Sequence, residues 1–316
     1  MTDGLQNELS RNQSHSSPTL SILIVSYNSK KFLDECVRSI LVEITVSYEV
    51  ILLDNASADG TADYVAQQYP WVRLIRSDTN LGFTRGNNVA ARLAQGDYIL
   101  LLNPDTILKT DVEPAVRILR ADPHVGVVGA RTYLGNGEEG HAGGHFPTVL
   151  RLWKFTWLWA NPTKHPYGEP ALRAYKVDWV EGSFLLTRSN NWRAIGGLDE
   201  GIFMYGEEVI FCRSTRDNGL VTVHCPDVEY VHFAGFNLSR LGYQYAGFCK
   251  YHQKFSYWPE RSLATFVLRV GLLLRIVVFG VIYKVTGRQR IGEKYRRVIQ
   301  INKEWPKNNF TAPRFE

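Results

Sequence analysis

The chain has 316 residues, of which 45% are hydrophobic and 12% aromatic, so it can bury a sizeable core without disulfides or metals, and disorder over its whole length is excluded. The formal net charge of +5 is unevenly distributed, because residues 240–316 hold 15 Lys and Arg against 4 Asp and Glu, a net of +11, and residues 1–239 therefore carry −6. A split of this kind indicates that one part of a chain meets a polyanion, either nucleic acid or an anionic membrane.

The cysteines and the N-terminus bear on the compartment. Cys36, Cys212, Cys225 and Cys249 are scattered, with no C-x-x-C pair and no His/Cys spacing suited to zinc, so a reducing cytosol fits best. Residues 1–19 are polar and lack the apolar stretch that a signal peptide needs. We therefore expect residues 1–19 to form a disordered leader.

From residue 20 onward, short apolar runs alternate with helical patterns. Leu20–Val25 predicts a strand, and over Lys31–Glu43 the apolar side chains fall on one helical face. The next elements are predicted as strands over 49–53, 72–75, 98–102 and 125–128, and as helices over 59–68, with Asp59 as N-cap, 84–95 and 111–120. Alternation with nearly all-apolar strands predicts an α/β fold, with a mostly parallel sheet and helices on both faces.

The pattern is lost over residues 135–175. This stretch is rich in Gly, Pro, His and Trp, and we expect a loop-rich insertion beside the site. Regular structure is predicted again over 177–187, in a helix over 206–218 and in a strand over 220–224.

Polar residues follow each of the first four strands. Because an open α/β sheet binds ligands at the carboxyl ends of its strands, these positions indicate one polar crevice. They are Ser26, Tyr27 and Asn28 after the first strand, Asp54 and Asn55 after the second, Asn80 and Gly82 after the third, and Asn103 and Asp105 after the fourth. Turn and cap roles explain any one of these residues better, but their recurrence at four strand ends favours a site for a polar, sugar-like ligand.

Asp105 has the most specific chemistry of this group. A lone carboxylate at a strand end can hold Mg²⁺ or Mn²⁺, since such an ion needs only one or two protein carboxylates and takes its other ligands from water and phosphate. The alternative is that Asp105 caps the helix that begins near Asp111.

Two phosphate-binding fingerprints are missing from the sequence. No G-x-G-x-x-G follows the first strand, and no G-x-x-x-x-G-K-[ST] occurs anywhere. A dinucleotide oxidoreductase and a P-loop phosphotransferase would therefore lack their phosphate-binding loops.

A second polar group comes later in the chain, at Glu181-Gly182, Glu207-Glu208 and His232. The helix macrodipole explains one of two adjacent acids at a helix start, and the other is a candidate general base. His232 ends a short apolar run and is a buried structural histidine, a metal ligand or a phosphate donor.

Taken in chain order, these residues resemble the family 2 glycosyltransferases of GT-A fold, and most closely their bacterial rhamnosyltransferase-like branch. The resemblance covers about residues 20 to 255, and it is carried by Ser26-Tyr27-Asn28, Asp54-Asn55-Ala56-Ser57, Asp59-Gly60-Thr61, Asn80-x-Gly82-Phe83, Gly86-Asn87-Asn88, Leu102-Asn103-Pro104-Asp105, Glu207-Glu208 and His232. The ordered set is far more specific than any single motif. It implies a GT-A domain over 20–255, with a nucleotide-binding half over 20–130 and an acceptor-binding, catalytic half over 131–255.

The resemblance also implies an activity and a role for each matching residue. The activity is transfer of a sugar, with rhamnose as a candidate, from a nucleotide-diphosphate donor to an acceptor hydroxyl, with inversion at the anomeric carbon. The donor side would comprise Ser26, Tyr27, Asn28, Asp54, Asn55, Asn80, Gly82, Arg85, Asn103 and Asp105. Asp105 matches the last acid of the family's D-x-D metal motif, and His232 matches a histidine that helps to hold metal or diphosphate.

The catalytic base of the family matches Glu208, and we keep its neighbour Glu207 in reserve. On the acceptor side of the site we expect Trp179, Glu181 and Gly182. An inverting displacement needs a base within reach of the acceptor hydroxyl and positive charge on the departing diphosphate, so Glu208 and a Mg²⁺ or Mn²⁺ ion at Asp105 together satisfy the chemistry.

Two departures from the family pattern affect this interpretation. Asn103 stands in place of the first D-x-D acid, and Glu208 in place of the usual Asp makes the base one methylene longer. Ile210 also stands where an acid is common. These departures favour the alternative hypothesis, a nucleotide-sugar-binding protein without catalysis.

The basic tail contains an apolar segment, Leu263–Tyr283, that is interrupted by Arg269 and Arg275. A spanning helix needs ~20 apolar residues, and an arginine near its centre costs ~2.5–3.5 kcal/mol, so two arginines argue against spanning. We favour an interfacial helix with its arginines at the headgroups, followed by a basic segment that ends at Arg297. The alternative is a buried C-terminal helix with a solvated basic end.

Nucleic acid is the competing polyanion for this tail. No helix-turn-helix, zinc-finger or RNA-binding signature accompanies the charge, so we do not expect nucleic acid as a partner. We expect residues 256–316 to form a basic, amphipathic helical extension whose residues 263–297 contact an anionic membrane. The protein would then be peripheral on the cytoplasmic face of the cell membrane, where a lipid-diphosphate acceptor would explain both the charge and the apolar surface.

Overall fold

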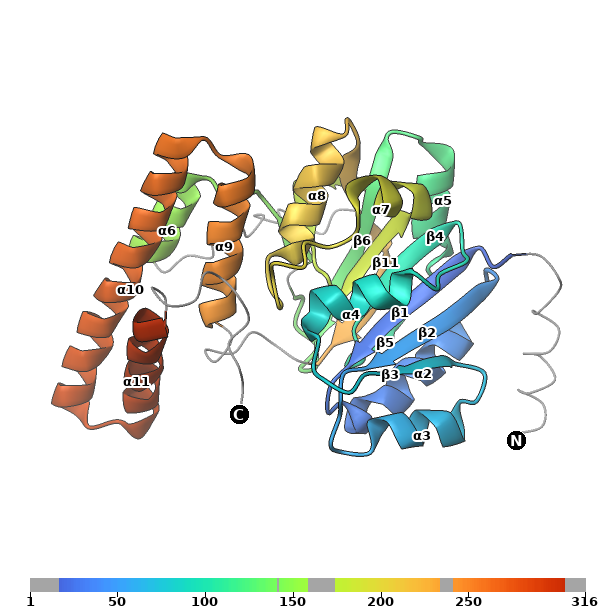
Figure 1. Cartoon of the computed structure of the whole chain (residues 1–316), viewed down its shortest axis with the longest axis horizontal. Helices are drawn as coiled ribbons and strands as arrows, with labels where there is room; N and C mark the ends of the chain where they lie inside the picture. Colours follow the sequence, from blue (N-terminus) through green and yellow to red (C-terminus); the bar gives the residue numbers. More distant parts are fainter. Residues whose placement is uncertain (1–16, 141, 159–173, 234–240, 305–316) are drawn as a thin grey trace.

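The computed structural model describes residues 17–140, 142–158, 174–233 and 241–304. Figure 1 shows an α/β part built on one sheet and, beside it, a helical part. The helical part comprises α6 (Val149–Leu158), α9 (Leu241–Phe255), α10 (Trp258–Thr286) and α11 (Gln289–Glu304). The disordered leader expected over residues 1–19 lies outside the described residues, except for its last three.

The first half of the sheet is parallel, as the sequence predicts. Its strands are β1 (Leu20–Ser26), β2 (Tyr48–Asp54), β3 (Arg73–Arg76) and β4 (Tyr98–Leu102), in the order β3-β2-β1-β4. Each of these four predicted strands is confirmed to within one residue at either end, whereas the strand predicted over 125–128 continues to Leu134. The parallel order brings the carboxyl ends of β1, β2 and β4 to one edge, where a ligand site is expected.

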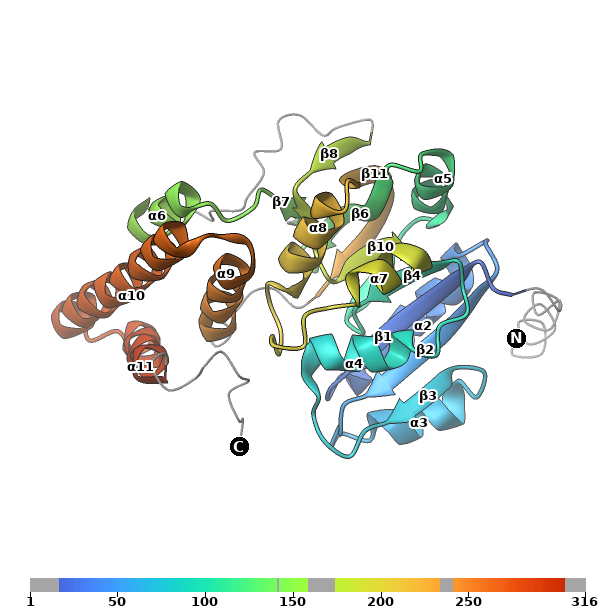
Figure 2. The same ribbon diagram turned by 45° about the horizontal axis from the view of Figure 1, so that its top comes forward.

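Alternating side chains of the strands explain why helices cover both faces of this sheet. Ile22 and Ile24 are buried against α2 (Lys30–Glu43), α3 (Thr61–Gln68) and α5 (Glu113–Ala121). Leu23, which lies between them, is buried in the opposite core. That core includes α4 (Gly82–Ala91), α7 (Ser189–Ile195) and α8 (Glu207–Asp217), which lie in front of the sheet in Figure 2.

The second half of the sheet is mixed, because β10 (Phe184–Arg188) runs antiparallel between β4 and β6 (Val125–Leu134). Next to β6 lies β11 (Val221–His232), which also pairs with β5 (Thr106–Leu108) and β8 (Tyr175–Val177). The strand predicted over 220–224 was too short. It continues past a register shift between Cys225 and Glu229, where the interrupted pairing hides the strand pattern.

One local prediction was incomplete and another was wrong. The stretch 135–175 contains α6 and also β7 (Gly143–Gly144), which pairs with β9 (Trp179–Val180). The reason is tertiary packing, since Leu152 of α6 is fully buried in the core of the helical part. Residue 60, not Asp59, is the N-cap of α3, and Asp59 instead accepts hydrogen bonds from the backbone N–H groups of Thr61 and Lys30, at 3.0 and 3.1 Å.

Candidate active site

Sheet register brings three distant segments of the chain together. Because β10 is antiparallel to β4, Phe184 pairs with Leu102, and the Asn103 backbone N–H donates to the Ser183 carbonyl oxygen at 3.1 Å. The end of β11 pairs with β5, so that His232 lies opposite Thr106. The residues that follow β4, those that precede β10 and the end of β11 therefore form one site.

His232 lies at the centre of this site. Its Nε2 is 3.4 Å from Asp105 Oδ1 and 3.4 Å from Asn103 Nδ2, and its Nδ1 is 4.0 Å from Glu181 Oε2. The side chains of His232 and Asp105 are 17% and 13% exposed, so the imidazole and the carboxylate can be reached from solvent but are largely shielded from it. The structure therefore joins the predicted metal residues to Glu181. Asp105 precedes β5 and does not cap α5, since it is Asp111 whose carboxylate accepts from the Glu113 backbone N–H.

The two acids of the pair differ in environment. Glu207 is buried, and burial together with the neighbouring Glu208 raises the pKa of the Glu207 carboxyl well above its usual range. Burial raises the pKa of Glu208 to about 7, and the charge of Glu181 contributes to that rise. Hydrogen bonds from the backbone oppose it, including one from the Gly206 N–H to Glu208 Oε2 at 3.1 Å. Glu208 is therefore the acid poised to exchange a proton near neutral pH.

The backbone that carries these acids is fixed by a tight turn and by α9. Tyr205 and Gly206 both have left-handed φ values, 68° and 98°. A Cβ on Gly206 would lie 2.9 Å from Gly247 Cα, so only glycine fits between α8 and α9 at this point. The helical part thus contributes directly to the position of Glu208.

The carboxyl ends of β1 and β2 carry the residues predicted for the nucleotide. Ser26 and Asp54 pair across β1 and β2, and both are buried. Asp54 Oδ2 accepts from the Ser57 backbone N–H at 3.0 Å, but Asp54 Oδ1 and Ser26 Oγ have no hydrogen-bond partner among the described residues. Buried polar atoms are normally paired, so these two atoms indicate a bound polar group such as a base or a ribose.

Other residues predicted for the donor side hold the loops of the site. The Asn55 side chain donates to the Gly82 carbonyl oxygen and accepts from the Leu81 backbone N–H, at 3.0 and 2.9 Å. Asn80 accepts from the Gly82 backbone N–H at 2.9 Å. Asn55 and Asn80 thus set the start of α4 through hydrogen bonds within the protein.

Three further donor-side residues lie at the rim. Tyr27 is 51% exposed, so its ring is available to a ligand. Asn28 has a left-handed φ of 51°, and its side chain accepts from the Ala58 backbone N–H at 2.8 Å. Arg85 is exposed and lies 3.8 Å from Glu200.

The residues expected on the acceptor side divide into two groups. Gly182 lies beside the acid pair, since a Cβ placed on it would be 3.7 Å from Glu207 Oε1 and 3.4 Å from Phe83. Trp179 is buried and its indole N–H donates to the His145 carbonyl oxygen at 3.0 Å. Gly182 therefore belongs to the site, whereas Trp179 supports the strand that carries it.

The donor set suits a divalent cation held mainly by phosphate. No group of three or more His, Cys, Asp and Glu side chains within the described ranges is arranged to hold a metal by itself. Asp105 supplies one carboxylate and His232 one imidazole, and Mg²⁺ or Mn²⁺ binds with one or two carboxylates when a substrate supplies phosphate oxygens. The residues present fit a cation that arrives with a nucleotide diphosphate.

Sequence reasoning missed one residue that supports the site. The Tyr230 hydroxyl is 2.8 Å from Ser183 Oγ, which in turn donates to Glu181 Oε2 at 3.1 Å. Tyr230 precedes His232 by two residues in β11, so both point to the same face of the sheet. The two-residue period of the strand was the signal that could have found it.

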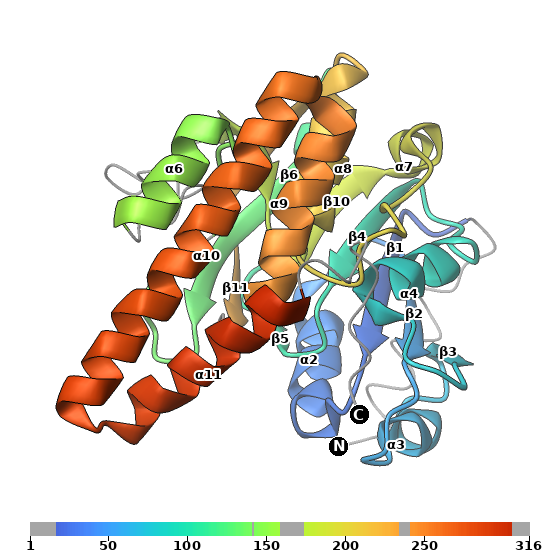
Figure 3. The same ribbon diagram turned by 60° about the vertical axis from the view of Figure 1, so that its left-hand side comes forward.

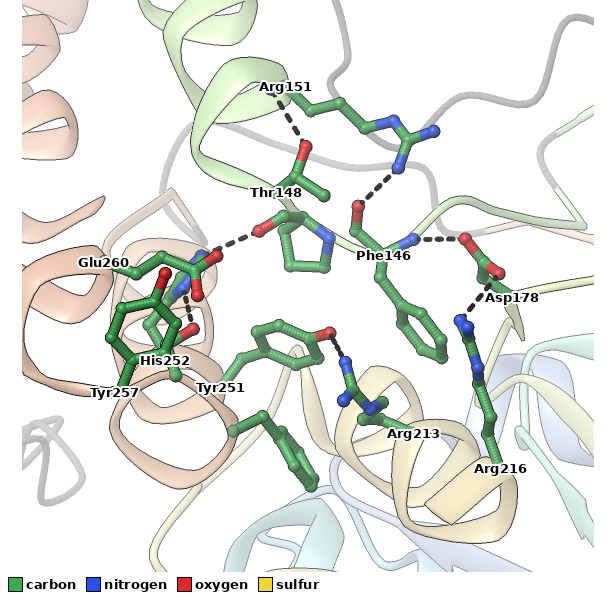
Figure 4. Close-up of a pocket in the computed structure, with 13 residues that line it drawn as sticks. Phe146, Thr148, Arg151, Asp178, Arg213, Arg216, Tyr251, His252, Tyr257 and Glu260 are labelled. Carbon is green, nitrogen blue, oxygen red and sulfur yellow. Dashed lines mark hydrogen bonds and ion pairs between the residues drawn. The ribbon is translucent and has the colours of Figure 1, made fainter. Parts of the chain in front are cut away.

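A separate pocket of about 270 Å³ lies where the α/β and helical parts meet (Figure 4). Its labelled side chains come from the start of α6, from α8 and from α9 and α10, and they include Arg151, Arg213 and Arg216. Asp178 lies 3.7 Å from Arg216, and Tyr251 accepts from Arg213 at 3.2 Å. None of the residues predicted for the active site lines this pocket. Its lining residues come from both parts of the protein.

A sheet whose first half is parallel, with polar residues at the carboxyl ends of its strands beside a candidate general base and a metal-compatible carboxylate, is typical of a group-transfer enzyme. The model of the family named glycosyl transferase family 2 matches residues 21–184, more than half of the chain. The chain belongs to this family and is a glycosyltransferase that moves a sugar from a nucleotide-sugar donor to an acceptor.

Two curated relatives are similar over most of the chain. One is the N-acetylglucosaminyl-diphospho-decaprenol L-rhamnosyltransferase of Mycobacterium tuberculosis, 26% identical over 70% of this chain and 78% of its own length. The other is the rhamnosyltransferase WbbL of Escherichia coli, 26% identical over 67% of this chain and 83% of its own.

Solved structures share the fold at low identity. GalNAc-T7 with UDP, GalNAc and Mn²⁺ has a TM-score of 0.59 at 15% identity, covering 94% of this chain and 57% of that one. The mannosyltransferase PcManGT from Pyrobaculum calidifontis, in complex with GDP-Man and Mn²⁺, has a TM-score of 0.54 at 13% identity, covering 97% of this chain and 95% of that one. The GT-A fold expected from the sequence is thereby confirmed.

Proposed function

We propose that this glycosyltransferase is an inverting, metal-dependent enzyme that transfers a hexosyl group, with rhamnose as the first candidate, from a nucleotide-diphosphate sugar to a hydroxyl of a lipid-linked glycan. The observation that carries this proposal is the convergence of Asp105, His232 and Glu181 with the acid pair that contains Glu208. One site would thereby provide a place for the diphosphate and a base of suitable pKa.

In the proposed reaction, the acceptor hydroxyl oxygen attacks the anomeric carbon from the side opposite the nucleoside diphosphate. The new carbon–oxygen bond forms as the bond to the diphosphate oxygen breaks, and the leaving diphosphate keeps the electron pair. Glu208, when ionised, takes the proton of the acceptor hydroxyl. Burial and the neighbouring Glu208 raise the pKa of Glu207 well above its usual range, which favours the protonated form of Glu207 and makes Glu208 the better base.

Asp105 and His232 would hold the Mg²⁺ or Mn²⁺ ion, which supplies positive charge to the departing diphosphate. The unpartnered Asp54 Oδ1 and Ser26 Oγ would bind the base or the ribose, with Tyr27 at the rim. Support for the cation comes from the donor set of Asp105 and His232, and from the Mn²⁺ in the similar structures.

The proposed acceptor and location rest on the relatives and on the charge split. The name of the mycobacterial relative specifies a diphospho-decaprenol acceptor, and the +11 tail suits the same kind of substrate. We place the protein on the cytoplasmic face of the membrane, as a peripheral protein that contacts anionic lipid through residues 263–297. The reducing compartment inferred from four scattered cysteines supports this side of the membrane.

A panel of nucleotide sugars tests the reaction, with nucleoside diphosphate release as the readout and a lipid-linked glycan as acceptor. Glu208→Gln is expected to lower turnover by ~10²–10⁴-fold, because it removes the base, and to leave donor binding intact. Asp105→Asn is expected to weaken metal-dependent donor binding and turnover together. The exposed acid Glu35 provides the control, and Glu35→Gln should keep full activity. Full turnover in Glu208→Gln, or donor binding with no turnover in the unaltered protein, would refute the proposed reaction.

A further inference from the structure

The outward face of α10 is unusually apolar for a surface that no described element covers. Beyond Trp258 at its start, this one helix exposes eight large apolar side chains: Leu263, Phe266, Leu273, Val277, Val278, Val281, Ile282 and Val285. Most of them are separated by three, four or seven residues, and the rest are adjacent pairs, so they form a broad apolar stripe along one side of the helix. Contiguous apolar surface of this extent marks an interaction site in a folded protein.

The inward face of the same helix already has its protein partners. Leu268 and Leu272 are fully buried, in a core shared with Leu152 of α6 and with Tyr245 and Phe248 of α9. Figure 3 shows α10 as the outer layer of the helical part, with α9 behind it and α6 and α11 alongside. The exposed stripe therefore faces away from the rest of the protein.

The buried charge on α10 belongs to this inward face. Arg275 is 6% exposed, and its guanidinium donates to the Tyr245 hydroxyl at 2.9 Å. The expectation that Arg275 would reach lipid headgroups was therefore wrong, because the side chain turns toward α9. Two arginines, Arg269 and Arg275, interrupt the apolar segment. Because Arg275 is buried, its charge does not lie on the outward face.

The two ends of the stripe carry the residue types that occur at a lipid–water boundary. Tyr257 and Trp258, at the start of α10, are 74% and 71% exposed. Exposed basic residues follow the other end of the stripe at Lys284, Arg288 and Arg290. Tyrosine and tryptophan favour the headgroup level, and clustered Lys and Arg are attracted to anionic lipid.

The packing of α10 also decides between lying on a membrane and crossing it. Trp258–Thr286 is long and apolar enough to span a bilayer. A spanning orientation would surround the helix with lipid, whereas here a whole face packs on α6, α9 and α11. With 29 residues the helix is ~44 Å long, well over the ~30 Å of a hydrocarbon core. Both facts fit a helix that lies parallel to the membrane surface.

We propose that the outward face of α10 is a docking surface for an anionic phospholipid bilayer, with the helix in the plane of the interface, its apolar stripe in the acyl boundary and Lys284, Arg288 and Arg290 on the headgroups. The inference rests on the proposed function in one respect: a lipid-linked acceptor has to be met at the bilayer. It assigns the contact to one helix face and to one orientation.

Vesicle co-sedimentation of the full-length protein tests this surface without any sugar substrate. Binding is expected to vesicles of phosphatidylcholine mixed with phosphatidylglycerol, and it should fall with salt and on phosphatidylcholine alone. The double variant Phe266→Glu with Val277→Glu should weaken binding by ~10-fold or more, since it puts two charges into the apolar stripe. Point substitutions are preferred to truncation, because the inward face of α10 covers the core of the helical part.

Val42 offers a matched control, since it is an exposed valine on α2, far along the chain from the stripe, with 73% exposure against 62% for Val277. Val42→Glu should bind vesicles as the unaltered protein does. Equal binding by the double variant, or equal loss in Val42→Glu, would overturn the proposal. An alkaline carbonate wash releases peripheral but not spanning proteins, so retention of the bound protein after this wash would overturn it too. A dimer that dissociates in the double variant would show that a second copy covers this face instead.

These outcomes are independent of the reaction. If vesicle binding behaves as expected while no donor is turned over, the proposed function fails and the docking surface stands. If the double variant loses vesicle binding but keeps turnover on a water-soluble acceptor, both hold. Turnover with no vesicle binding by the unaltered protein would refute the docking surface and the proposed membrane location, and it would leave the proposed reaction standing.

Discussion

Gly247 of α9 packs directly on the backbone of Tyr205, the residue that begins the turn into the acid pair. A Cβ placed on Gly247 would overlap the Tyr205 carbonyl oxygen and would lie 3.2 Å from Gly206 Cα. Tyr205 and Gly206 are both left-handed, so this turn has little freedom to move aside. The helical part is therefore connected to the α/β part at the residues that position Glu208.

The first prediction follows from this contact. Gly247→Ala should lower turnover by ~10-fold or more while donor binding is preserved, because the added methyl group displaces the turn and with it the carboxyl group of Glu208. Gly242 lies in the same helix, and a Cβ there would meet Ile301 at an ordinary 3.5 Å. Gly242→Ala should leave turnover unchanged and, by helix propensity alone, add up to ~1 kcal/mol of stability. Equal turnover in the two variants would contradict the positioning role of Gly247.

The second prediction concerns the pH dependence of the reaction. The pKa of Glu208 is raised to about 7 by burial, and a base must be ionised to work. The value of kcat/KM should therefore rise with pH on the acid side of about 7 and level off above it. Glu181→Gln removes a negative charge that raises this pKa, so the acid limb should move to lower pH. A pH–rate profile measured for both proteins provides the check, and an unmoved limb would mean that another group titrates.

The third prediction concerns stability rather than rate. The pKa of Glu207 is higher in the folded state than in an unfolded chain, so the folded state binds more protons between the two values. The contribution of Glu207 to stability should accordingly fall as pH rises above the ordinary glutamate range, and it should be greatest below that range. Glu207→Gln should flatten this dependence and raise the melting temperature more at about pH 8 than at about pH 5. Equal shifts at both pH values would indicate that Glu207 is ionised in the folded protein.

The sequence predicted much of the site because its residues follow the ends of strands. Ser26, Asp54 and Asp105 lie where β1, β2 and β4 end, and a continuous apolar run makes each of these strands recognisable. What escaped prediction depends on tertiary contacts. The Gly206–Gly247 contact joins helices that are distant along the chain, and local pattern carries no signal for it. The mixed half of the sheet and the helix within 135–175 were obscured for the same reason, since packing, not local propensity, determines them.

The fourth prediction tests the nucleotide end of the crevice. Asp54→Asn retains an oxygen that can accept from the Ser57 backbone N–H, so the fold should be little affected. The substitution changes the unpartnered acceptor Oδ1 into a donor, and the Michaelis constant for the donor sugar nucleotide should rise by ~10-fold. Asp63 is 82% exposed and pairs with Arg76, so Asp63→Asn is the matched control and should leave the Michaelis constant unchanged. An unaltered Michaelis constant in Asp54→Asn would remove Asp54 from the donor site.

The fifth prediction addresses the buried charge that holds α10 to α9. Tyr245→Phe removes the hydroxyl that accepts from Arg275, and it should lower the free energy of unfolding by about 1–3 kcal/mol because a buried charged donor loses a partner.

Tyr283 is also on α10, and its ring stacks on Tyr295 at 6.5 Å, so Tyr283→Phe preserves the ring contact and should change stability little. Adding Arg275→Met to Tyr245→Phe should restore part of the loss, since no charge then remains buried at that position. Denaturant unfolding of Tyr245→Phe, Arg275→Met and the double variant measures the coupling. Additive losses in the double variant would show that Arg275 and Tyr245 stabilise the helical part independently, and that the pair does not hold α10 against α9.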